Sequence, residues 1–273
     1  MKQVITLVLL LVGGVIGSLV HPFYGILPYY ILAILRPQSL WEYALPEDVR
    51  WSLLAAGVAF AAVVIHSAKI LRRLKWNSVA TLMAIFAGLV LLSCLTARHP
   101  DVAGNRGIEY LKIFVMAGIA TVVIHRVHHV RLLMLAIFAC IGYVAWEFNV
   151  RYIFDGSLYI FFEGHGGLDS NDSSVMLAMG LPLAYAGWRI RRHWVTAAIA
   201  VFAALMIIHA IMLSYSRSGM VAALVAVTWI AIHHKPRWHL AVLAPAMIAA
   251  TLFLAGQEVR YEFLSIRDFE QDA

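Results

Sequence analysis

The sequence predicts an all-α, polytopic transmembrane helical bundle of roughly eight to ten spans. Of its 273 residues, 62% are hydrophobic and only 13% are charged, whereas a soluble domain carries about 25% charged residues. The mean hydropathy is +0.82. The apolar residues fall in recurrent runs of about 17 to 20, the length that crosses a hydrocarbon core of ~30 Å. These runs lack a period of two, which excludes the alternating strands of a closed barrel.

The first apolar run follows Lys2 and covers residues 4–20. No small-x-small cleavage site follows it, and His21-Pro22 leads directly into another apolar stretch, so an uncleaved anchor is expected. Gly13 and Gly17 have the small-xxx-small spacing that lets a neighbouring helix approach closely.

The spans that follow are predicted from apolar runs of sufficient length. In chain order, the predicted spans are residues 4–20, 23–35, 51–70, 77–95, 108–124, 132–148, 173–188, 195–213, 219–232 and 240–255. The run 23–35 is short for a span, so a re-entrant segment is an open alternative, and the orientation of the N-terminus stays open with it. The whole bundle is predicted to occupy residues 1–256.

Basic loops alternate with acidic or mixed loops, and this asymmetry assigns the basic loops to the cytoplasmic side. The basic residues are Lys69, Arg72, Arg73 and Lys75, then Arg126 and Arg131, then Arg189, Arg191 and Arg192, then Lys235 and Arg237. The external side then receives residues 98–107, 149–172 and 214–218 and the tail from residue 257.

One external loop, Ser214-Tyr215-Ser216-Arg217-Ser218-Gly219, places an arginine between two apolar spans. An arginine near lipid is costly and marks a site or a partner. The alternative is that Arg217 extends to the headgroups and only anchors the helix ends. Because serines and a glycine surround the guanidinium, the loop suits a phosphate or pyrophosphate. Arg217, Ser214 and Ser216 are therefore predicted to bind substrate.

A second polar stretch, residues 164–174, enters the span that begins near Ser173. Asn171, Asp172 or Ser173 is predicted to cap that helix. The positive end of the helix dipole faces outward here, so the same backbone could help hold an anionic ligand. Asn171 and Asp172 accordingly complete the predicted substrate-binding set.

Histidines form the remaining polar feature of interest. His209 is expected to bond to a neighbouring helix. The histidines in basic loops lack acidic or cysteine partners, so they are predicted to be solvated, headgroup-facing residues and no metal site. These are His125, His128, His129, His233, His234 and His239.

The chain resembles the O-antigen ligase and polymerase-like superfamily, specifically the O-glycosylation ligases associated with exosortase systems. The resemblance covers nearly the whole length. Residues 214–219 are similar to the S-x-S-R-[GS] signature, and Asp169-Ser170-Asn171-Asp172 with the Leu-Pro-Leu of 181–183 is similar to a D-N-N-D stretch running into a helix. His21-Pro22-Phe23-Tyr24-Gly25 and Leu35-Arg36-Pro37-Gln38 look like the family's N-terminal pattern. Arg36 and Ser170 stand where that pattern has asparagine.

The resemblance implies a GT-C-like membrane glycosyltransferase architecture. It implies transfer of a glycan from an undecaprenyl-diphosphate carrier to an acceptor, at the periplasmic face of the bacterial inner membrane. Arg217 would contact the carrier's diphosphate, and a base would activate the acceptor hydroxyl. The expected partners are the lipid-linked oligosaccharide, a protein or lipid acceptor and membrane lipid. No cofactor, metal or nucleic acid is expected.

The family continues into a large external loop with a second arginine and a histidine-bearing segment. Residues 257–273 look like the start of that loop, and Val259, Phe263 and Ile266 have the spacing of a surface-lying helix. The resemblance therefore implies an incomplete ligase that is inactive by itself, with catalytic residues in a missing C-terminal part.

Three alternatives remain open. A polymerase of the same superfamily would use Arg217 and differ only in its acceptor. A small-anion, bicarbonate-like transporter would need discontinuous helices and polar residues near the bilayer midplane, whereas the polar positions here cluster at the predicted external ends. A noncatalytic assembly protein would tolerate loss of Arg217.

Overall fold

The computed structural model describes residues 2–45, 49–71, 78–189 and 193–233, and these residues form helices joined by loops, with no strand among them. The chain divides into two compact units, which are described separately. Unit 1 comprises residues 1–30 and 50–133, and unit 2 comprises residues 31–49 and 134–273. The predicted all-α class is confirmed for the described residues.

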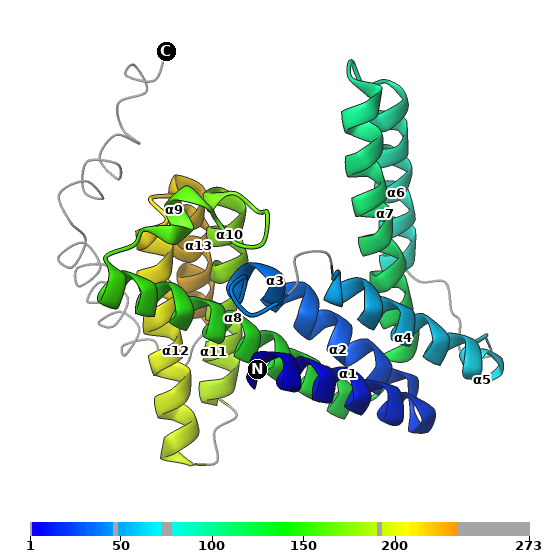
Figure 1. The fold of residues 1–273 in the computed structure, drawn as a ribbon, viewed down its shortest axis with the longest axis horizontal. Coiled ribbons are helices and arrows are strands. Elements are labelled where there is room, and N and C mark those ends of the chain that lie inside the picture. Colours follow the sequence, from blue (N-terminus) through cyan, green and yellow to red (C-terminus); the bar gives the residue numbers. More distant parts are fainter. Residues whose placement is uncertain (1, 46–48, 72–77, 190–192, 234–273) are drawn as a thin grey trace. The chain divides into compact units, whose positions relative to one another are not determined.

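Unit 1 holds the N-terminal helices and the helical hairpin of α6 and α7, which lie side by side (Figure 1). Its helices are α1 (Lys2–Val20), the first part of α2 (Pro22–Leu35), α4 (Trp51–Ile65), α5 (Ser67–Leu71), α6 (Ser78–Leu95), α7 (Pro100–Val123) and the start of α8 (Val127–Asp155). Their core is a buried cluster of Phe23, Ile26, Ala59, Met116 and Val123.

A tight turn at His21 joins α1 to α2. The His21 N–H donates to the Gly17 carbonyl at 3.0 Å. A Cβ at Gly14 would lie 2.6 Å from Pro28 Cγ, and one at Gly17 would lie 2.7 Å from Tyr24 Cβ. A Cβ at Gly13 would meet no atom of the described residues within 4 Å, so the predicted close approach of a helix at Gly13 was wrong for the part of the chain that the structure describes. Gly14 and Gly17 are the glycines that let the two helices approach.

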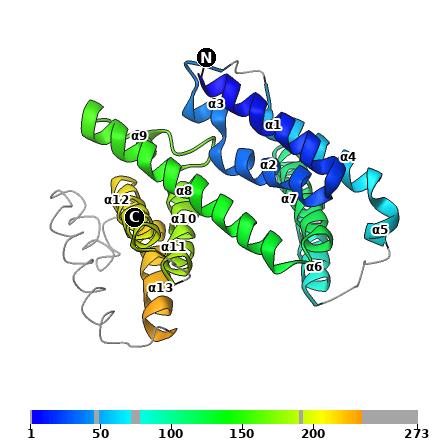
Figure 2. The ribbon, with the colours of Figure 1, turned by 90° about the horizontal axis from the view of Figure 1, so that it is seen from below.

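Unit 2 is a bundle in which α10 packs on α13 and α11 packs on α12. Figures 1 and 2 show α11 and α12 side by side. The unit contains the rest of α2, α3 (Pro37–Leu40), the rest of α8, α9 (Tyr159–Phe162), α10 (Ser170–Ala178), α11 (Gly180–Arg189), α12 (Trp194–Leu213) and α13 (Arg217–His233).

Buried polar groups tie α8 to α12. The Asn149 side-chain amide donates to the Met206 carbonyl at 2.9 Å, and the His209 ring bonds to the Asn149 side-chain oxygen. Asn149 is only 1% exposed, so its amide must find partners inside the protein. The prediction that His209 bonds to a neighbouring helix is confirmed.

Several predicted spans differ from the helices. The span 51–70 is divided at His66, which leaves helical geometry between α4 and α5. The span 173–188 starts earlier, at Ser170, and is interrupted at Met179. Pro182 explains that interruption, because proline has no N–H to give the carbonyl four residues earlier and its ring clashes with that carbonyl. The predicted span 240–255 lies outside the described residues.

Four described helices are long and apolar enough to cross a membrane, namely Gln3–Val20, Ser78–Leu95, Val127–Asp155 and Trp194–Leu213. Trp51–Ile65 and Arg217–His233 are apolar but shorter. Much of this apolar surface is exposed; on α6, for example, none of its residues is buried. Exposed apolar helices of this length belong in lipid, so the chain is a membrane protein. The total of eight to ten spans and the single bundle over 1–256 stay predictions.

Candidate functional site

The N-terminus of α10 forms one side of the candidate site. Asp169 is the residue before the helix, with φ −71° and ψ 179°, and its carboxylate accepts a hydrogen bond from the Asp172 N–H at 2.7 Å. Asp169 is therefore the N-cap, and the predicted cap at Asn171, Asp172 or Ser173 was wrong. The cap moves because the helix begins three residues earlier than the apolar run.

The turn between α12 and α13 forms the other side. The Ser214 hydroxyl donates to the Ile211 carbonyl at 2.6 Å and accepts from the Ser216 N–H at 3.3 Å. Tyr215 has a φ of 50°, in the left-handed region, and its ring meets Phe161 edge-on at 5.3 Å. Ser214 thus shapes its own turn, which then delivers Arg217 as the first residue of α13.

Hydrogen bonds join the two sides directly. The Ser216 hydroxyl donates to the Asn171 side-chain oxygen at 2.7 Å and accepts from the Gly219 N–H at 3.1 Å. Ser218 lies 2.9 Å from the Ser216 oxygen and donates to the same Asn171 oxygen at 3.3 Å. We call Asn171, Ser216 and Ser218 the serine network; it connects two stretches that are distant in sequence.

Close packing of α10 on α13 fixes this geometry. A Cβ at Gly219 would lie 2.2 Å from the Ser174 hydroxyl oxygen and 2.4 Å from Ser174 Cβ. No side chain larger than hydrogen fits at that position without moving one helix. The glycine of the motif therefore serves the approach of the two helix N-termini.

The structure thus brings together most of the predicted binding residues. Asn171 and Ser216 are hydrogen-bonded to each other, and Arg217 follows Ser216 with a half-buried side chain. Asp172 is exposed in the first turn of α10, and its carboxylate makes no hydrogen bond with a described residue. Ser218 was missed as a site residue, although its place two residues after Ser216 in the same motif was a usable signal.

Two helix N-termini and the hydroxyl and amide groups of the serine network therefore meet at one end of unit 2, and Arg217 is the first residue of α13. Helix N-termini carry partial positive charge, and arginine presents a planar fork of donors. This combination suits an oxyanion such as a phosphate or diphosphate. The carboxylates of Asp169 and Asp172 both lie at the N-terminus of α10 and reduce the positive field there, so the N-terminus of α13 and Arg217 contribute more of the attraction for an anion.

The glycine-rich stretch before α10 has a structural role. The Gly166 carbonyl accepts from the Arg36 guanidinium, the Gly166 N–H donates to the Ser39 hydroxyl at 3.1 Å, and the His165 Nε2–H donates to the Ile34 carbonyl at 2.8 Å. Within the loop, the His165 N–H bonds to the Leu168 carbonyl at 3.2 Å. These donors are used in docking the loop onto the end of α2 and α3, so they are not available to an anion.

Arg36 holds the other half of this docking contact. Its φ of 42° is left-handed, and it is the N-cap of α3. Asparagine tolerates left-handed geometry and caps helices better than most residues, which explains physically why the resembled pattern has asparagine there. Arginine lacks these advantages, but its longer side chain reaches the Gly166 carbonyl.

His165 is the buried centre of the docked loop. It is 1% exposed, and its Nδ1 has no hydrogen-bond partner among the described residues. Burial, opposed by the bond to Ile34 and aided by the positive charges of Arg36 and Arg151, lowers the pKa of His165 from 6.5 to about 4. The ring is therefore neutral at physiological pH.

A histidine cluster in unit 1 was missed by the sequence analysis. His129 is only 3% exposed, and its ring stacks on Phe23 with centroids 4.3 Å apart, so the prediction of a solvated His129 was wrong. It lies with His21 and His125, and one ring nitrogen from each lies within 4.8 Å of the others. The fold of unit 1 brings residue 21 to residues 125 and 129, and no sequence signal links them.

Comparison with known proteins gives one match. No curated protein and no solved structure matches the chain. The model of a family of unknown function, DUF5935, matches residues 1–181. That region includes the histidine cluster, the docked glycine-rich loop and Asn171, and it ends before Ser214. Since the match covers well over half of the sequence, the chain belongs to the DUF5935 family.

Proposed function

We propose that this protein is a membrane ligase, or part of one, that transfers a glycan from an undecaprenyl-diphosphate carrier to an acceptor. The observation that carries the proposal is the serine network, because it joins Asn171 on α10 to Ser216 and Ser218 beside Arg217. These are the two motifs on which the resemblance to O-antigen ligases rests. Two motifs that are distant in sequence and share a hydrogen-bonded junction are expected if they bind one ligand.

In this proposal the diphosphate lies against the N-termini of α10 and α13. Arg217 provides the permanent charge, and the Ser218 and Asn171 side chains, which are exposed, provide the accessible polar edge. A diphosphate is already a good leaving group, so catalysis chiefly requires donors that stabilise its developing charge. The acceptor hydroxyl also needs a general base, and none of the residues at this junction is assigned that role.

The polymerase alternative uses the same donor site and differs only in the acceptor. The transporter alternative calls for a discontinuous helix at a polar binding site. The chain has a helix interruption between α10 and α11, but its surroundings are apolar, since a Cβ at Gly180 would meet Ile141 and Ile207 at 2.7 Å. The side chains that border Gly180 here are therefore apolar, whereas polar side chains meet at the α10–α13 junction, which favours ligand chemistry at that junction.

The proposed location is the bacterial inner membrane, with the junction on the periplasmic side. The support is the distribution of lysine and arginine along the chain, which assigns Arg126, in the α7–α8 turn, and Arg131, near the start of α8, to the cytoplasm and residues 214–218 to the outside. A carrier presented on the periplasmic leaflet would then lie on the same side of the membrane as Arg217.

Binding of an undecaprenyl-diphosphate-linked glycan to the protein in nanodiscs tests the proposal. We expect saturable binding that falls at least about tenfold in both Arg217→Ala and Arg217→Lys, because lysine lacks the bidentate fork. The matched control is Arg106→Ala, since Arg106 is an exposed arginine in unit 1 that pairs with Glu109 at 3.4 Å. Equal binding by all four proteins, or no binding by any, contradicts the proposal and favours the assembly or transport readings.

A further inference from the structure

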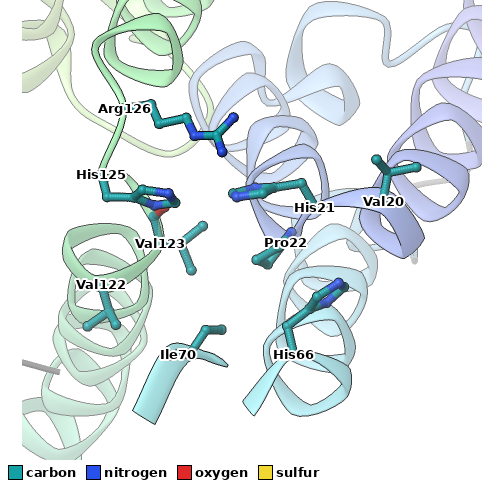
Figure 3. Close-up of a pocket in the computed structure, with 9 residues that line it drawn as sticks. All are labelled: Val20, His21, Pro22, His66, Ile70, Val122, Val123, His125 and Arg126. Atoms are coloured by element: carbon teal, nitrogen blue, oxygen red, sulfur yellow. The ribbon is translucent and has the colours of Figure 1, made fainter. Parts of the chain in front are cut away.

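The histidine cluster of unit 1 consists of His21, His125 and His129. His21 lies in the turn between α1 and α2, His125 in the turn between α7 and α8, and His129 in the first turn of α8. Their ring centroids are separated by 4.6 Å for His21 and His129 and by 5.5 Å for the other two pairs. Figure 3 shows the rings of His21 and His125 facing one another across a pocket.

We propose that these three histidines bind a single first-row transition-metal ion of the zinc class. Imidazole nitrogen is a preferred ligand of Zn²⁺, Co²⁺, Ni²⁺ and Cu²⁺. Three ring nitrogens already lie within 4.8 Å of one another. Ligands held at ~2.0 Å around a tetrahedral ion lie ~3.3 Å apart, so side-chain rotations of ångström size complete the site.

Two of the rings are oriented for metal binding. The His125 Nδ1–H donates to the Val123 carbonyl at 2.9 Å, which leaves the lone pair on Nε2, as is usual for metal-binding histidines. The His129 Nδ1 is buried without a hydrogen-bond partner among the described residues. Stacking on Phe23, with an interplanar angle of 8°, fixes the plane of the His129 ring. A buried ring nitrogen with no partner can accept a ligand, and the His129 ring differs from that of His165 in lying beside two other imidazoles.

His21 needs one rearrangement. Its Nδ1 accepts a hydrogen bond from the Phe23 N–H at 3.2 Å. To bind a metal, the ring must offer either that Nδ1 lone pair or, after a change of tautomer, the Nε2 lone pair, and both give up this long bond. The Phe23 N–H lies in the first turn of α2, where an N–H has no partner within the helix, so its release does not disturb the helix.

The surroundings favour a metal over an anion. The three clustered groups are imidazoles, which bind a metal ion in their neutral form and in that form give an anion no charge. The pocket has a volume of ≈ 180 Å³ and is also lined by His66, whose Nδ1 bonds to the Ala62 carbonyl at 3.0 Å. This volume accommodates a water molecule as the fourth ligand of an ion held by three histidines. Arg126 is the only permanent cation in the described lining.

A bound ion would join the α1–α2 turn to the α7–α8 turn. Both turns belong to unit 1, so the ion would stabilise this unit. The site is independent of the donor site proposed at the α10–α13 junction, and either can be correct without the other.

The experiment measures Zn²⁺ bound per chain by equilibrium dialysis, with Co²⁺ absorption as a second readout, on protein without a histidine tag in nanodiscs. We expect one ion per chain and at least about tenfold weaker binding in His21→Ala, His125→Ala and His129→Phe. His129→Phe preserves the stacking on Phe23, and circular dichroism checks that it folds. The matched controls are His128→Ala, next to the cluster, and His233→Ala at the end of α13.

Two outcomes overturn the proposal. Zn²⁺ binding that is absent, or that falls equally in His128→Ala, shows that these histidines do not form a specific metal site. Binding of inorganic phosphate that depends on His125 and Arg126, without Zn²⁺ binding, identifies an anion site instead. Co²⁺ absorption bands of tetrahedral type that disappear in His125→Ala, together with unchanged bands in both controls, support it.

Discussion

The serine network of unit 2 and the histidine cluster of unit 1 use polar atoms in opposite ways. In the serine network, the Ser216 hydroxyl both donates to Asn171 and accepts from the Gly219 N–H. In the histidine cluster, the His129 Nδ1 is buried without a protein partner among the described residues. The Ser216 hydroxyl therefore already has its partners within the protein. The His129 Nδ1 does not, so it can still accept a ligand.

This difference indicates what each region can do. The internal hydrogen bonds of the serine network fix the positions of the two helix ends that it joins. A ligand must therefore bind at the exposed side chains, Asn171 and Ser218. The His129 Nδ1 can accept a ligand directly, because it makes no hydrogen bond with a described residue, whereas His21 must first give up its long bond from the Phe23 N–H. Polar atoms with and without internal partners should therefore respond differently to substitution, pH and added ions.

The largest expected effect concerns His165, a buried ring with one nitrogen bonded to the Ile34 carbonyl and one without a partner among the described residues. Its pKa falls from 6.5 to about 4 on folding, so between these pH values the unfolded chain binds a proton that the folded chain does not. Stability contributed by the neutral ring is complete above pH 6.5 and is lost as the pH falls towards 4, by at most about 3 kcal/mol. Denaturant unfolding in micelles at pH 7 and pH 4.5 measures this loss.

His165→Gln isolates that contribution, since glutamine keeps a donor for the Ile34 carbonyl but does not titrate. We expect the variant to lose clearly less stability than the native chain between pH 7 and pH 4.5. The exposed His193, changed to glutamine, is the control and should leave the pH dependence unaltered. An identical pH dependence in the native chain and in His165→Gln would show that the buried ring is not responsible.

The next effect compares two hydroxyls within the serine network. Ser216→Ala removes the acceptor of the buried Gly219 N–H and should cost about 1–3 kcal/mol. Ser218 is exposed, and water can replace its bonds, so Ser218→Ala should cost no more than about 0.5 kcal/mol. Unfolding of both variants under the same conditions checks the ratio. Equal losses would mean that the network is not organised around Ser216.

Sequence reasoning was most successful where local chemistry decides the structure. Continuous apolar runs predicted most of the helices, and α12 (Trp194–Leu213) begins within one residue of its predicted span. The motif around Arg217 was recognised because its residues are contiguous. The sequence placed Asn171 and Ser216 in the same predicted binding site but did not predict the hydrogen bond between them. That bond depends on the packing of α10 against α13 at Gly219.

The errors have identifiable physical causes. The first residues of α10 are polar, so an apolar run does not reveal where the helix begins. The start of α10 at Ser170 and the capping by Asp169 were therefore missed. Hydropathy also cannot separate one span from two helices that a proline interrupts, as at Pro182. Tertiary proximity was inaccessible in principle, because the burial of His129 depends on where the α1–α2 turn places Phe23 and His21.

The smallest expected effect tests the other half of the comparison. His125 is exposed, and water can replace the bonds of an exposed side chain, so His125→Ala should change the stability of the metal-free protein by no more than about 0.5 kcal/mol. Zn²⁺ in hundredfold excess over its dissociation constant should stabilise the native chain by about 2.7 kcal/mol. The variant should gain much less. Unfolding in chelator and in Zn²⁺ gives both numbers, with His128→Ala as the control. A large loss of stability of His125→Ala in chelator would mean that His125 already stabilises the metal-free protein. The proposed contrast between the serine network and the histidine cluster would then be wrong at His125.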